Sequence, residues 1–461
     1  MWGEHMLQGK RRVHLVGIGG SGMSPLAKVL LEAGLDVRGS DLQASPALSA
    51  LRSLGARVVQ GHRAENVGDA ELLIVSAAVR PDNPELQEAR RLGLPVLKRS
   101  EALGELTRTR QCIAVAGTHG KTTTTSMISL VLVRAGLDPT FVVGGEVADL
   151  GASARLGRGE HIVVEADEFD GSFLRLWPRV AVLTNVEADH LDFYGDMAAM
   201  ERAFTSFVEL VPPHGLVVAC SDDPLALEIG KRSRAPVVSY GVSEGSDWQA
   251  SDVRLSGLGG NSYRLLHGGR DLGTVELMVP GLHNVANSLA ALVVSAHLGL
   301  DLDAAKEALR SFSGARRRFE VKGVAGGVTV VDDYAHHPTE VRATLQAARE
   351  RQAGRLWCVF QPHTYHRTKS LLPEFACSFD LADRVLVVDV YTPAGREIDD
   401  LGISSADLVK AMRHSGAQHV GSLDCAVDTL LRELRPADML LTLGAGDVYK
   451  VGEAVLAGLG G

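Results

Sequence analysis

The sequence has few cysteines, few aromatic residues and no long apolar run. Its five cysteines are scattered and include no C-x-x-C pair, which argues against a disulfide framework and against a thiolate metal site. No stretch approaches about 18 uncharged apolar residues, so we expect no membrane span. The amino-terminal segment MWGEHMLQGKRR lacks the apolar core of a signal peptide. These features favour a cytoplasmic protein.

An excess of basic charge is also missing. The formal net charge is −9 and no long basic run occurs, which argues against nucleic-acid binding. The chain of 461 residues is long enough for two or three domains. Fifty glycines and an aromatic content of 5% suit an α/β architecture with many tight turns between strands and helices.

Short apolar, β-like runs alternate with helical patterns in three blocks of the chain. This alternation predicts an α/β fold with mainly parallel sheets covered by helices on both faces. We predict three domains, at residues 1–110, 111–314 and 315–461. Ligands of open α/β sheets bind beyond the carboxyl ends of the strands, and the polar clusters of this sequence follow β-like runs.

The segment CIAVAGTHGKTTTT, from Cys112 to Thr125, is the most informative stretch. A β-like run, a glycine turn and a helical pattern together form a cradle of backbone N–H groups for phosphate oxygens. Lys121 can reach the β- and γ-phosphates, and the Thr122 hydroxyl can bind the Mg²⁺ that bridges them. Val115 stands where a strict phosphate loop has glycine, so the match rests on Gly117, Gly120, Lys121 and Thr122. The segment indicates binding of a nucleoside triphosphate.

A second glycine-rich turn, G-x-G-x-x-G, follows the run VHLV and spans Gly17, Gly19 and Gly22. Asp41 follows at the spacing of a ribose-binding acid. This pattern is compatible with an NAD site, and an NAD-dependent oxidoreductase is the alternative function. The motif itself requires only that the backbone approach a diphosphate closely, which a UDP-sugar also carries. A separate triphosphate loop and the lack of an obvious hydride-transfer site weigh against the oxidoreductase.

Other polar residues follow predicted strands. Glu165 ends HIVVE, and His190 ends the run VAVLTNVEADH, so both could lie beside the phosphate loop and bind Mg²⁺. The loops DDYAHHP and QPHTYHRT concentrate histidine, tyrosine and charged residues, as binding loops do. Three consecutive arginines, ending at Arg318, stand between the second and third blocks.

Together these segments resemble the Mur ligase family. The matching pieces occur in order over nearly the full chain: HLVGIGGSGMSPLA, GTHGKTTTT, EADEFDGSF, TNVEADHLDFYG, PGLHNVANSLAAL, GARRRFE, VDDYAHHPTE and QPHTYHRT. The resemblance is closest to the members that join L-alanine to UDP-N-acetylmuramate, and the nearest alternative is the murein peptide ligase. It implies a Rossmann-like UDP-binding domain, a central ATP-binding domain and a Rossmann-like carboxyl-terminal domain that binds the amino acid. It also implies ATP and Mg²⁺ as cofactors and an acyl-phosphate intermediate in peptidoglycan precursor synthesis.

The resemblance assigns roles to individual residues. It implies that the ATP site consists of Gly117, Thr118, His119, Gly120, Lys121, Thr122, Thr123, His283, Asn284, Asn287, Arg318 and Asp333. The metal ligands would be Thr122, Glu165 and His190. The UDP-sugar site would contain Gly17, Gly19, Gly20, Ser21, Gly22, Asp41, His62 and Ser76. The amino-acid site would contain Tyr334, His336 and Arg367, and the catalytic residues would be Lys121, Glu165, His190, His336, His363 and Arg367.

Two departures from the family pattern are informative. Thr364 stands where some relatives have arginine, which leaves Arg367 as the stronger candidate for the carboxylate of the amino acid. Several later Mur ligases carry a lysine, shortly after the His190-type motif, that becomes carbamylated and binds metal, but no lysine occurs here between His190 and Lys231. The sequence leaves open the choice among alanine, glycine, serine or a peptide as the amine. We expect a monomer or a homodimer.

Overall fold

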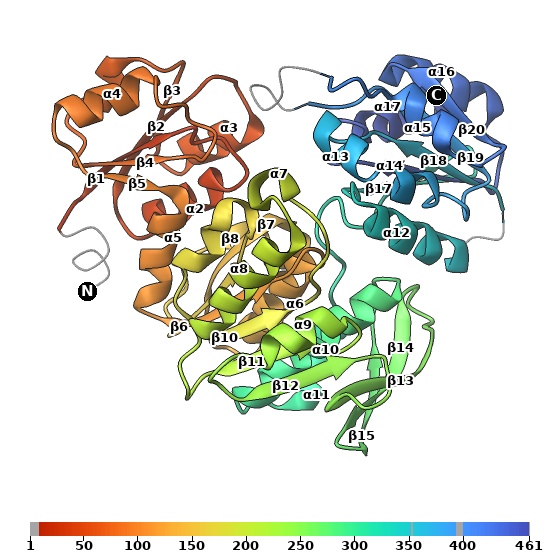
Figure 1. Ribbon diagram of the computed structural model, residues 1–461, viewed down its shortest axis with the longest axis horizontal. Coiled ribbons are helices and arrows are strands. Elements are labelled where there is room, and N and C mark those ends of the chain that lie inside the picture. Colours follow the sequence, from red (N-terminus) through yellow and green to blue (C-terminus); the bar gives the residue numbers. More distant parts are fainter. Residues whose placement is uncertain (1–8, 352–353, 393–399, 461) are drawn as a thin grey trace. The chain divides into compact units, whose positions relative to one another are not determined.

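The computed structural model describes residues 9–351, 354–392 and 400–460, and it contains three β-sheets with flanking helices (Figure 1). The chain forms two compact units. The first unit runs through Val253 and includes Tyr263–Val275 and Ala286–Phe312. The second unit contains Arg254–Ser262, Glu276–Val285 and the chain from Ser313 onward.

The amino-terminal sheet has five parallel strands in the order β3-β2-β1-β4-β5. The strands are β1 (Arg12–Val16), β2 (Asp36–Asp41), β3 (Arg57–Gln60), β4 (Leu72–Val75) and β5 (Val96–Lys98). The helices around them are α2 (Met23–Glu32), α3 (Pro46–Ser53), η1 (Ala64–Val67), α4 (Pro84–Arg91) and α5 (Arg99–Arg108). The strand order reverses between β1 and β4, which is where ligands bind in doubly wound sheets.

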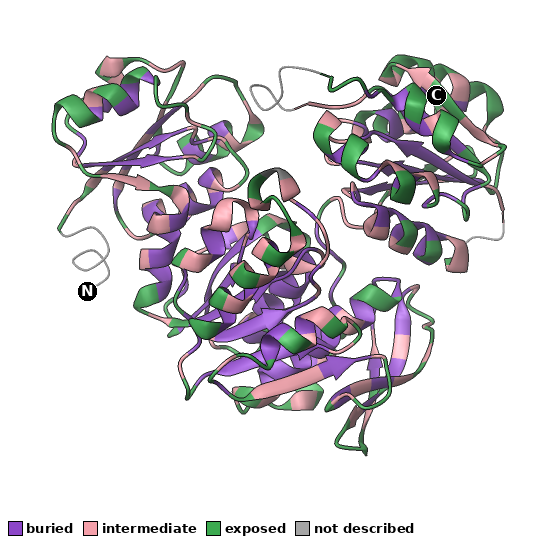
Figure 2. Cartoon of the chain, in the orientation of Figure 1, coloured by how far each residue is buried: buried purple, intermediate pink, exposed green. Residues whose placement is uncertain are grey.

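Both faces of this sheet are buried. In β4, Leu72 and Ile74 pack with α2 and α5, whereas Leu73 and Val75 pack with Leu86 and neighbours from α4 and η1. Successive side chains of a strand point to opposite faces, so a strand covered on both sides is apolar throughout. Figure 2 shows the inner strands β1 and β4 as largely buried and the outer faces of the helices as exposed, whereas the edge strand β3 is mostly exposed.

The central sheet has ten strands in the order β15-β14-β13-β12-β11-β10-β6-β9-β7-β8. They are β6 (Gln111–Ala116), β7 (Thr140–Val147), β8 (Ala152–Arg155), β9 (His161–Glu165), β10 (Pro178–Leu183), β11 (Leu216–Cys220), β12 (Val237–Gly241), β13 (Trp248–Leu255), β14 (Asn261–His267) and β15 (Arg270–Glu276). Strands β10, β6 and β9 run parallel, and β7 and β8 form an antiparallel pair at one edge.

The helical segments that accompany the central sheet are α6 (Lys121–Arg134), η2 (Ala148–Leu150), η3 (Phe169–Arg175), α7 (Leu191–Tyr194), α8 (Met197–Glu209), α9 (Pro224–Gly230), α10 (Leu282–His297) and α11 (Leu302–Arg310). Helix α6 is buried over most of its length although four threonines follow Lys121 at its start. The hydroxyls of Thr125, Ser126 and Ser129 each donate to the backbone carbonyl four residues earlier, so burial leaves them satisfied.

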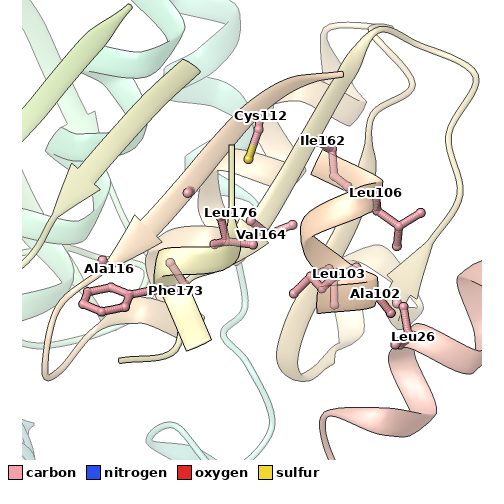
Figure 3. Close-up of a cluster of buried hydrophobic side chains, with 14 of the residues drawn as sticks. Leu26, Ala102, Leu103, Leu106, Cys112, Ala116, Ile162, Val164, Phe173 and Leu176 are labelled. Atoms are coloured by element: carbon pink, nitrogen blue, oxygen red, sulfur yellow. The ribbon is translucent and has the colours of Figure 1, made fainter. Parts of the chain in front are cut away.

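One buried cluster continues from the amino-terminal sheet into the central sheet. Figure 3 shows Leu26 of α2 beside Ala102 and Leu103 of α5, with Ile162 of β9 and Leu106 close by. Phe173 in η3 belongs to the same cluster. This shared core accounts for the presence of both sheets in the first unit.

The second unit is built on a six-stranded sheet with the order β16-β17-β21-β18-β19-β20. Its strands are β16 (Glu320–Ala325), β17 (Val328–Asp333), β18 (Leu356–Phe360), β19 (Arg384–Val388), β20 (Ala417–Gly421) and β21 (Met439–Leu443). Its helices are α12 (Pro338–Arg351), α13 (Tyr365–Ser370), α14 (Leu372–Ala376), α15 (Ser405–Ala411), α16 (Leu423–Glu433) and α17 (Tyr449–Leu459). Among the described residues of this sheet, β16 pairs antiparallel with β17 and the other strand pairs are parallel, and α12 and α17 cover opposite faces.

The prediction of an α/β chain with three mainly parallel sheets is confirmed. The domain boundaries after residues 110 and 314 stay predictions. Within the described residues, no helix combines the length and the apolar character needed to cross a membrane.

Candidate functional site

The predicted phosphate loop joins β6 to α6. Gly117 and Gly120 have positive φ angles of 139° and 81°. The loop is held by the segment that follows β10: the Thr118 N–H donates to the Asn185 carbonyl over 2.9 Å, and the His119 N–H donates to the Asn185 side chain over 2.8 Å. A Cβ atom on Gly117 would lie 2.0 Å from the Thr184 hydroxyl oxygen. Contacts within the protein therefore hold the shape of this loop.

We expect Gly117→Ala to destabilise the protein by about 2 kcal/mol, because the new methyl group overlaps Thr184 and the backbone angle disfavours any side chain. Urea unfolding would measure the loss. Gly257→Ala is the matched control, since a Cβ atom there meets no atom within 4 Å. Equal stability of the two variants would contradict this account of the loop.

Lys121 begins α6, and its ammonium is held by an ion pair. Its Nζ atom lies 2.8 Å from Oε2 of Glu168 and donates to the Thr118 carbonyl over 3.0 Å. Glu168 is buried, and burial raises the pKa of Glu168 to about 7 although the charge of Lys121 opposes the shift. The Tyr194 hydroxyl donates to the Glu168 backbone carbonyl. Lys121 is thus oriented at the loop by a carboxylate that the sequence analysis did not single out.

Thr122 and Glu165 form the centre of the predicted metal site. The Thr122 hydroxyl lies 3.0 and 3.1 Å from the two carboxylate oxygens of Glu165, and Oε2 accepts from the Gly144 N–H over 2.7 Å. A hydroxyl and a carboxylate at the mouth of a phosphate loop form a donor set of oxygen atoms, which fits Mg²⁺. His190 lies in the loop after β10, where its ring makes an edge contact with Phe169 at a centroid distance of 5.1 Å.

Three of the residues predicted for the ATP site, His283, Asn284 and Asn287, lie at the start of α10. Oδ1 of Asn287 accepts from the Thr124 hydroxyl over 3.0 Å, so Asn287 lies against the helix of the phosphate loop. A Cβ atom on Gly120 would lie 2.8 Å from the same Asn287 oxygen. Asn284 is buried and donates to the Pro280 carbonyl, whereas His283 is exposed. Thr123 is buried in the first turn of α6.

The first glycine loop lies at the reversal point of the amino-terminal sheet. The Gly19 N–H donates to Oδ2 of Asp41 over 2.9 Å. A Cβ atom on Gly17 would lie 3.3 Å from that of Ser76, which follows β4. The remaining predicted residues of the loop, Gly20, Ser21 and Gly22, lead into α2. The structure therefore brings the loops after β1, β2 and β4 together.

His62 follows β3 and lies in the same part of the amino-terminal sheet. Its Nδ1 atom lies 2.9 Å from the Ser40 hydroxyl oxygen, and Ser40 precedes Asp41 in β2. The predicted UDP-sugar residues thus come from the ends of adjacent strands in one sheet.

In the second unit, Asp333 ends β17 and organises the backbone around it. Its two carboxylate oxygens accept from the N–H groups of Phe319 and Ala335, each over 2.8 Å. Burial raises the pKa of Asp333 to about 6, and the nearby charge of Arg318 opposes the shift. The Arg318 guanidinium lies 5.5 Å from the ring centre of Tyr334 and 3.4 Å from Glu340.

The predicted amino-acid residues form a continuous row of side chains. The His336 ring lies 5.2 Å from that of Tyr334 and 5.7 Å from that of His363, measured between centroids. Arg367 donates to Nδ1 of His363 over 3.2 Å. A guanidinium only donates, so this contact leaves the proton of a neutral His363 on Nε2. The Thr364 side chain caps α13 by accepting from the Arg367 N–H, and its backbone has a positive φ of 67°. Thr364 therefore has a structural role.

Arg317, the second arginine of the run, is bound on several sides. Its guanidinium lies between the rings of Tyr334 and Tyr449, 5.0 Å from each centre, and it pairs with the buried Asp332 at 2.9 Å. It also donates to the Gly444 and Gly446 carbonyls. The sequence identified the run of three arginines but not these partners of Arg317, because they come from different parts of the chain.

With this geometry established, comparison with known proteins identifies the class. The chain belongs to the Mur ligase family. Residues 12–111 match the description "Mur ligase family, catalytic domain", residues 115–295 match the Mur ligase middle domain, and residues 317–446 match the Mur ligase glutamate ligase domain.

Particular members are similar over nearly the whole chain. The chain is 45% identical to UDP-N-acetylmuramate–L-alanine ligase of Caldanaerobacter subterraneus subsp. tengcongensis, covering 97% of both sequences. It is 47% identical to the ligase of that name from Solibacter usitatus, covering 97% of this chain and 95% of the relative. Among solved structures, UDP-N-acetylmuramate-alanine ligase of Thermotoga maritima matches with a TM-score of 0.82 at 31% identity, covering 97% of this chain and 98% of that one. A murein peptide ligase of Psychrobacter arcticus matches with a TM-score of 0.73 at 27% identity and the same coverage.

Proposed function

We propose that this chain is an ATP-dependent ligase that joins L-alanine to the carboxylate of UDP-N-acetylmuramate, a cytoplasmic step of peptidoglycan synthesis. The observation that carries the proposal is 45% identity over 97% of both chains to a ligase of that name. The alanine-adding ligase of Thermotoga maritima also matches better than the murein peptide ligase, with a TM-score of 0.82 against 0.73.

The phosphate loop suits the first half of such a reaction. A free carboxylate is a poor acyl donor, and phosphorylation gives it a leaving group. Attack of the substrate carboxylate on the γ-phosphorus of ATP forms the acyl C–O–P linkage and breaks the bond to ADP. Both reactants are anions, so the Lys121 ammonium would offset their repulsion and the charge of the transferring group.

Thr122 and Glu165 would hold Mg²⁺, with His190 as a further ligand. The bound ion would supply positive charge to the β- and γ-phosphates. This assignment rests on Thr122 and Glu165, because the Thr122 hydroxyl lies next to the Glu165 carboxylate at the phosphate loop.

The row of aromatic and basic side chains in the second unit suits the second half of the reaction. We assign the alanine carboxylate to Arg367, which can bind it with two parallel hydrogen bonds. His336 and His363 would contact the transferring group, and Tyr334 would line the site of the amino acid. The amine of alanine then attacks the acyl carbon, a tetrahedral intermediate forms, and phosphate leaves as the amide bond forms.

The test is release of ADP by the full chain with ATP, Mg²⁺ and UDP-N-acetylmuramate, comparing L-alanine, glycine, L-serine and the tripeptide substrate of murein peptide ligases. We expect turnover that requires the sugar nucleotide and is fastest with L-alanine. Fastest turnover with the peptide would assign the alternative function. Reduction of NAD, with no ADP released under any condition, would reject the ligase.

We further expect activity to be independent of bicarbonate. The chain has no lysine between His190 and Lys231 that could form a carbamate, and Glu201 in that stretch is paired with Arg232 at 2.7 Å. Turnover in degassed, bicarbonate-free buffer at mildly acidic pH should therefore equal turnover with bicarbonate added at the same pH. Strong, reversible stimulation would show that the assigned metal ligands are wrong.

A further inference from the structure

Glu85 is a carboxylate with no exposed surface inside the amino-terminal sheet domain, and none of the roles assigned above uses it. It lies in the first turn of α4, where Asn83 caps the helix by accepting from the Glu85 N–H. Because Asn83 provides the cap, the Glu85 side chain is not needed to start helix α4. A buried charge is costly unless other groups bind it, so Glu85 needs polar partners in the fold.

The carboxylate of Glu85 is surrounded by polar groups from β1, β2 and the segment after β3. The Ser40 hydroxyl and the Asn66 amide donate to it, and the His14 and His62 rings each approach Oε2 to 3.4 Å. Burial disfavours its charge, but the polar contacts with His14, Ser40 and Asn66 outweigh this effect and hold the pKa of Glu85 below its usual value. Glu85 is therefore an anion that accepts hydrogen bonds and donates none.

This charge fixes the direction of the neighbouring hydrogen bonds. The single hydroxyl proton of Ser40 is donated to Glu85, so Ser40 can only accept in its 2.9 Å contact with Nδ1 of His62. The proton of a neutral His62 must then be on Nδ1. Its other ring nitrogen, Nε2, is left as a hydrogen-bond acceptor.

The same residues connect the two loops assigned to the nucleotide. The Ser40 carbonyl accepts from the N–H groups of Gly17 and Ile18 in the first glycine loop, over 2.8 and 3.1 Å. Asn66, which is bound to Glu85, also donates to the Gly61 carbonyl beside His62, over 3.0 Å. Glu85 thus links the glycine loop after β1 to the His62 loop after β3.

We propose that Glu85 is a positioning residue for recognition of the uridine nucleotide: through Ser40 it holds His62 in the Nδ1–H form, so that Nε2 accepts a hydrogen bond from an N–H or O–H donor of the uridine. The inference rests on the proposed binding of the UDP-sugar in this domain. The uracil N3–H and the ribose hydroxyls are the uridine donors available for this contact.

Glu85→Gln tests the proposal because it keeps the size of the side chain and permits the hydrogen-bond direction to reverse. The glutamine amide can donate to Ser40, whose hydroxyl would then donate to Nδ1 of His62 and move the imidazole proton to Nε2. We expect the KM for UDP-N-acetylmuramate to rise about tenfold, the effect of one lost hydrogen bond. The kcat and the KM values for ATP and L-alanine should stay within about twofold of the wild type.

The spectroscopic readout is the ¹⁵N spectrum of the full chain labelled at histidine, recorded at pH 8.5, well above the ordinary imidazole pKa of about 6.5. His62→Gln assigns the signals. We expect Nδ1 of His62 to be the protonated nitrogen in the wild type and Nε2 in Glu85→Gln. Glu88→Gln, a partly exposed carboxylate of the same helix that pairs with Arg91, is the matched control and should leave both the kinetics and the spectrum unchanged.

Calorimetry with UDP, N3-methyl-UDP and the 2′- and 3′-deoxy analogues identifies the donor. The wild type should bind one of the modified ligands more weakly than UDP, and Glu85→Gln should lose that preference. An unchanged His62 tautomer, or equal losses for all three substrates with a lower thermal midpoint, would overturn the inference. If wild-type binding of UDP is absent or unaffected by Asp41→Ala, the assignment of the UDP site itself fails, which is a distinguishable result.

Discussion

Lys121→Ala should lower the rate of ADP release at least ~10³-fold, with the protein still folded. The change removes the positive charge that we assign to the transferring phosphoryl group, and preorganised charges of this kind act mainly on the transition state. Contacts with Glu168 and with the Thr118 carbonyl already hold the Lys121 ammonium at the phosphate loop. Steady-state and single-turnover measurements at saturating ATP, Mg²⁺, UDP-N-acetylmuramate and L-alanine would give the loss in kcat.

Lys410→Ala is the control for this experiment, since Lys410 is an exposed lysine on α15. Its turnover should match the wild type. Near-normal turnover of Lys121→Ala would show that the loop does not act on the transferring phosphate. A loss confined to the KM for ATP would show that Lys121 contributes to ground-state binding alone.

Local sequence predicted the parts of the site that depend on a few consecutive residues. The turn from Gly117 to Thr122 needs a strand, two glycines and a helix start, all of which are visible in one segment. Alternation of strands and helices likewise predicted the three mainly parallel sheets, since a βαβ unit is a local pattern. The β7–β8 and β16–β17 pairs were not predicted, because their strands contain glycine and polar residues and are stabilised by their partners.

Residues whose role depends on distant partners could not be predicted. Glu168 is one of three acidic residues in EADE, and only the fold shows that it is the one paired with Lys121. The run of three arginines identifies a basic segment, but the two tyrosine rings around Arg317 come from different parts of the chain. Glu85 carries no motif at all, because its four polar neighbours are brought together by the order of the parallel strands.

The second large effect concerns stability and comes from the same ion pair. Removing one partner of a buried pair leaves an uncompensated charge, whereas replacing both partners with neutral side chains of similar size is often close to neutral. We expect Lys121→Met to lower the free energy of unfolding by about 3 kcal/mol at pH 8.5. The double variant Lys121→Met/Glu168→Gln should recover most of this loss. Urea unfolding followed by circular dichroism would measure all three proteins.

The pH dependence follows from the carboxyl group that is left behind. The folded-state pKa of Glu168 is about 7 with Lys121 present, against an ordinary value of 4.5, and it must rise further without the ammonium. Protonation therefore favours the folded state, and the penalty for the ionised group is absent at low pH and grows as the pH rises through 7. The loss in Lys121→Met should shrink to less than about 1 kcal/mol at pH 5.5, and the double variant should show no such change. The partly exposed pair changed in Arg91→Met/Glu88→Gln should give no measurable pH dependence between these two pH values. A loss in Lys121→Met of equal size at both pH values would show that Glu168 does not carry the charge in this pair.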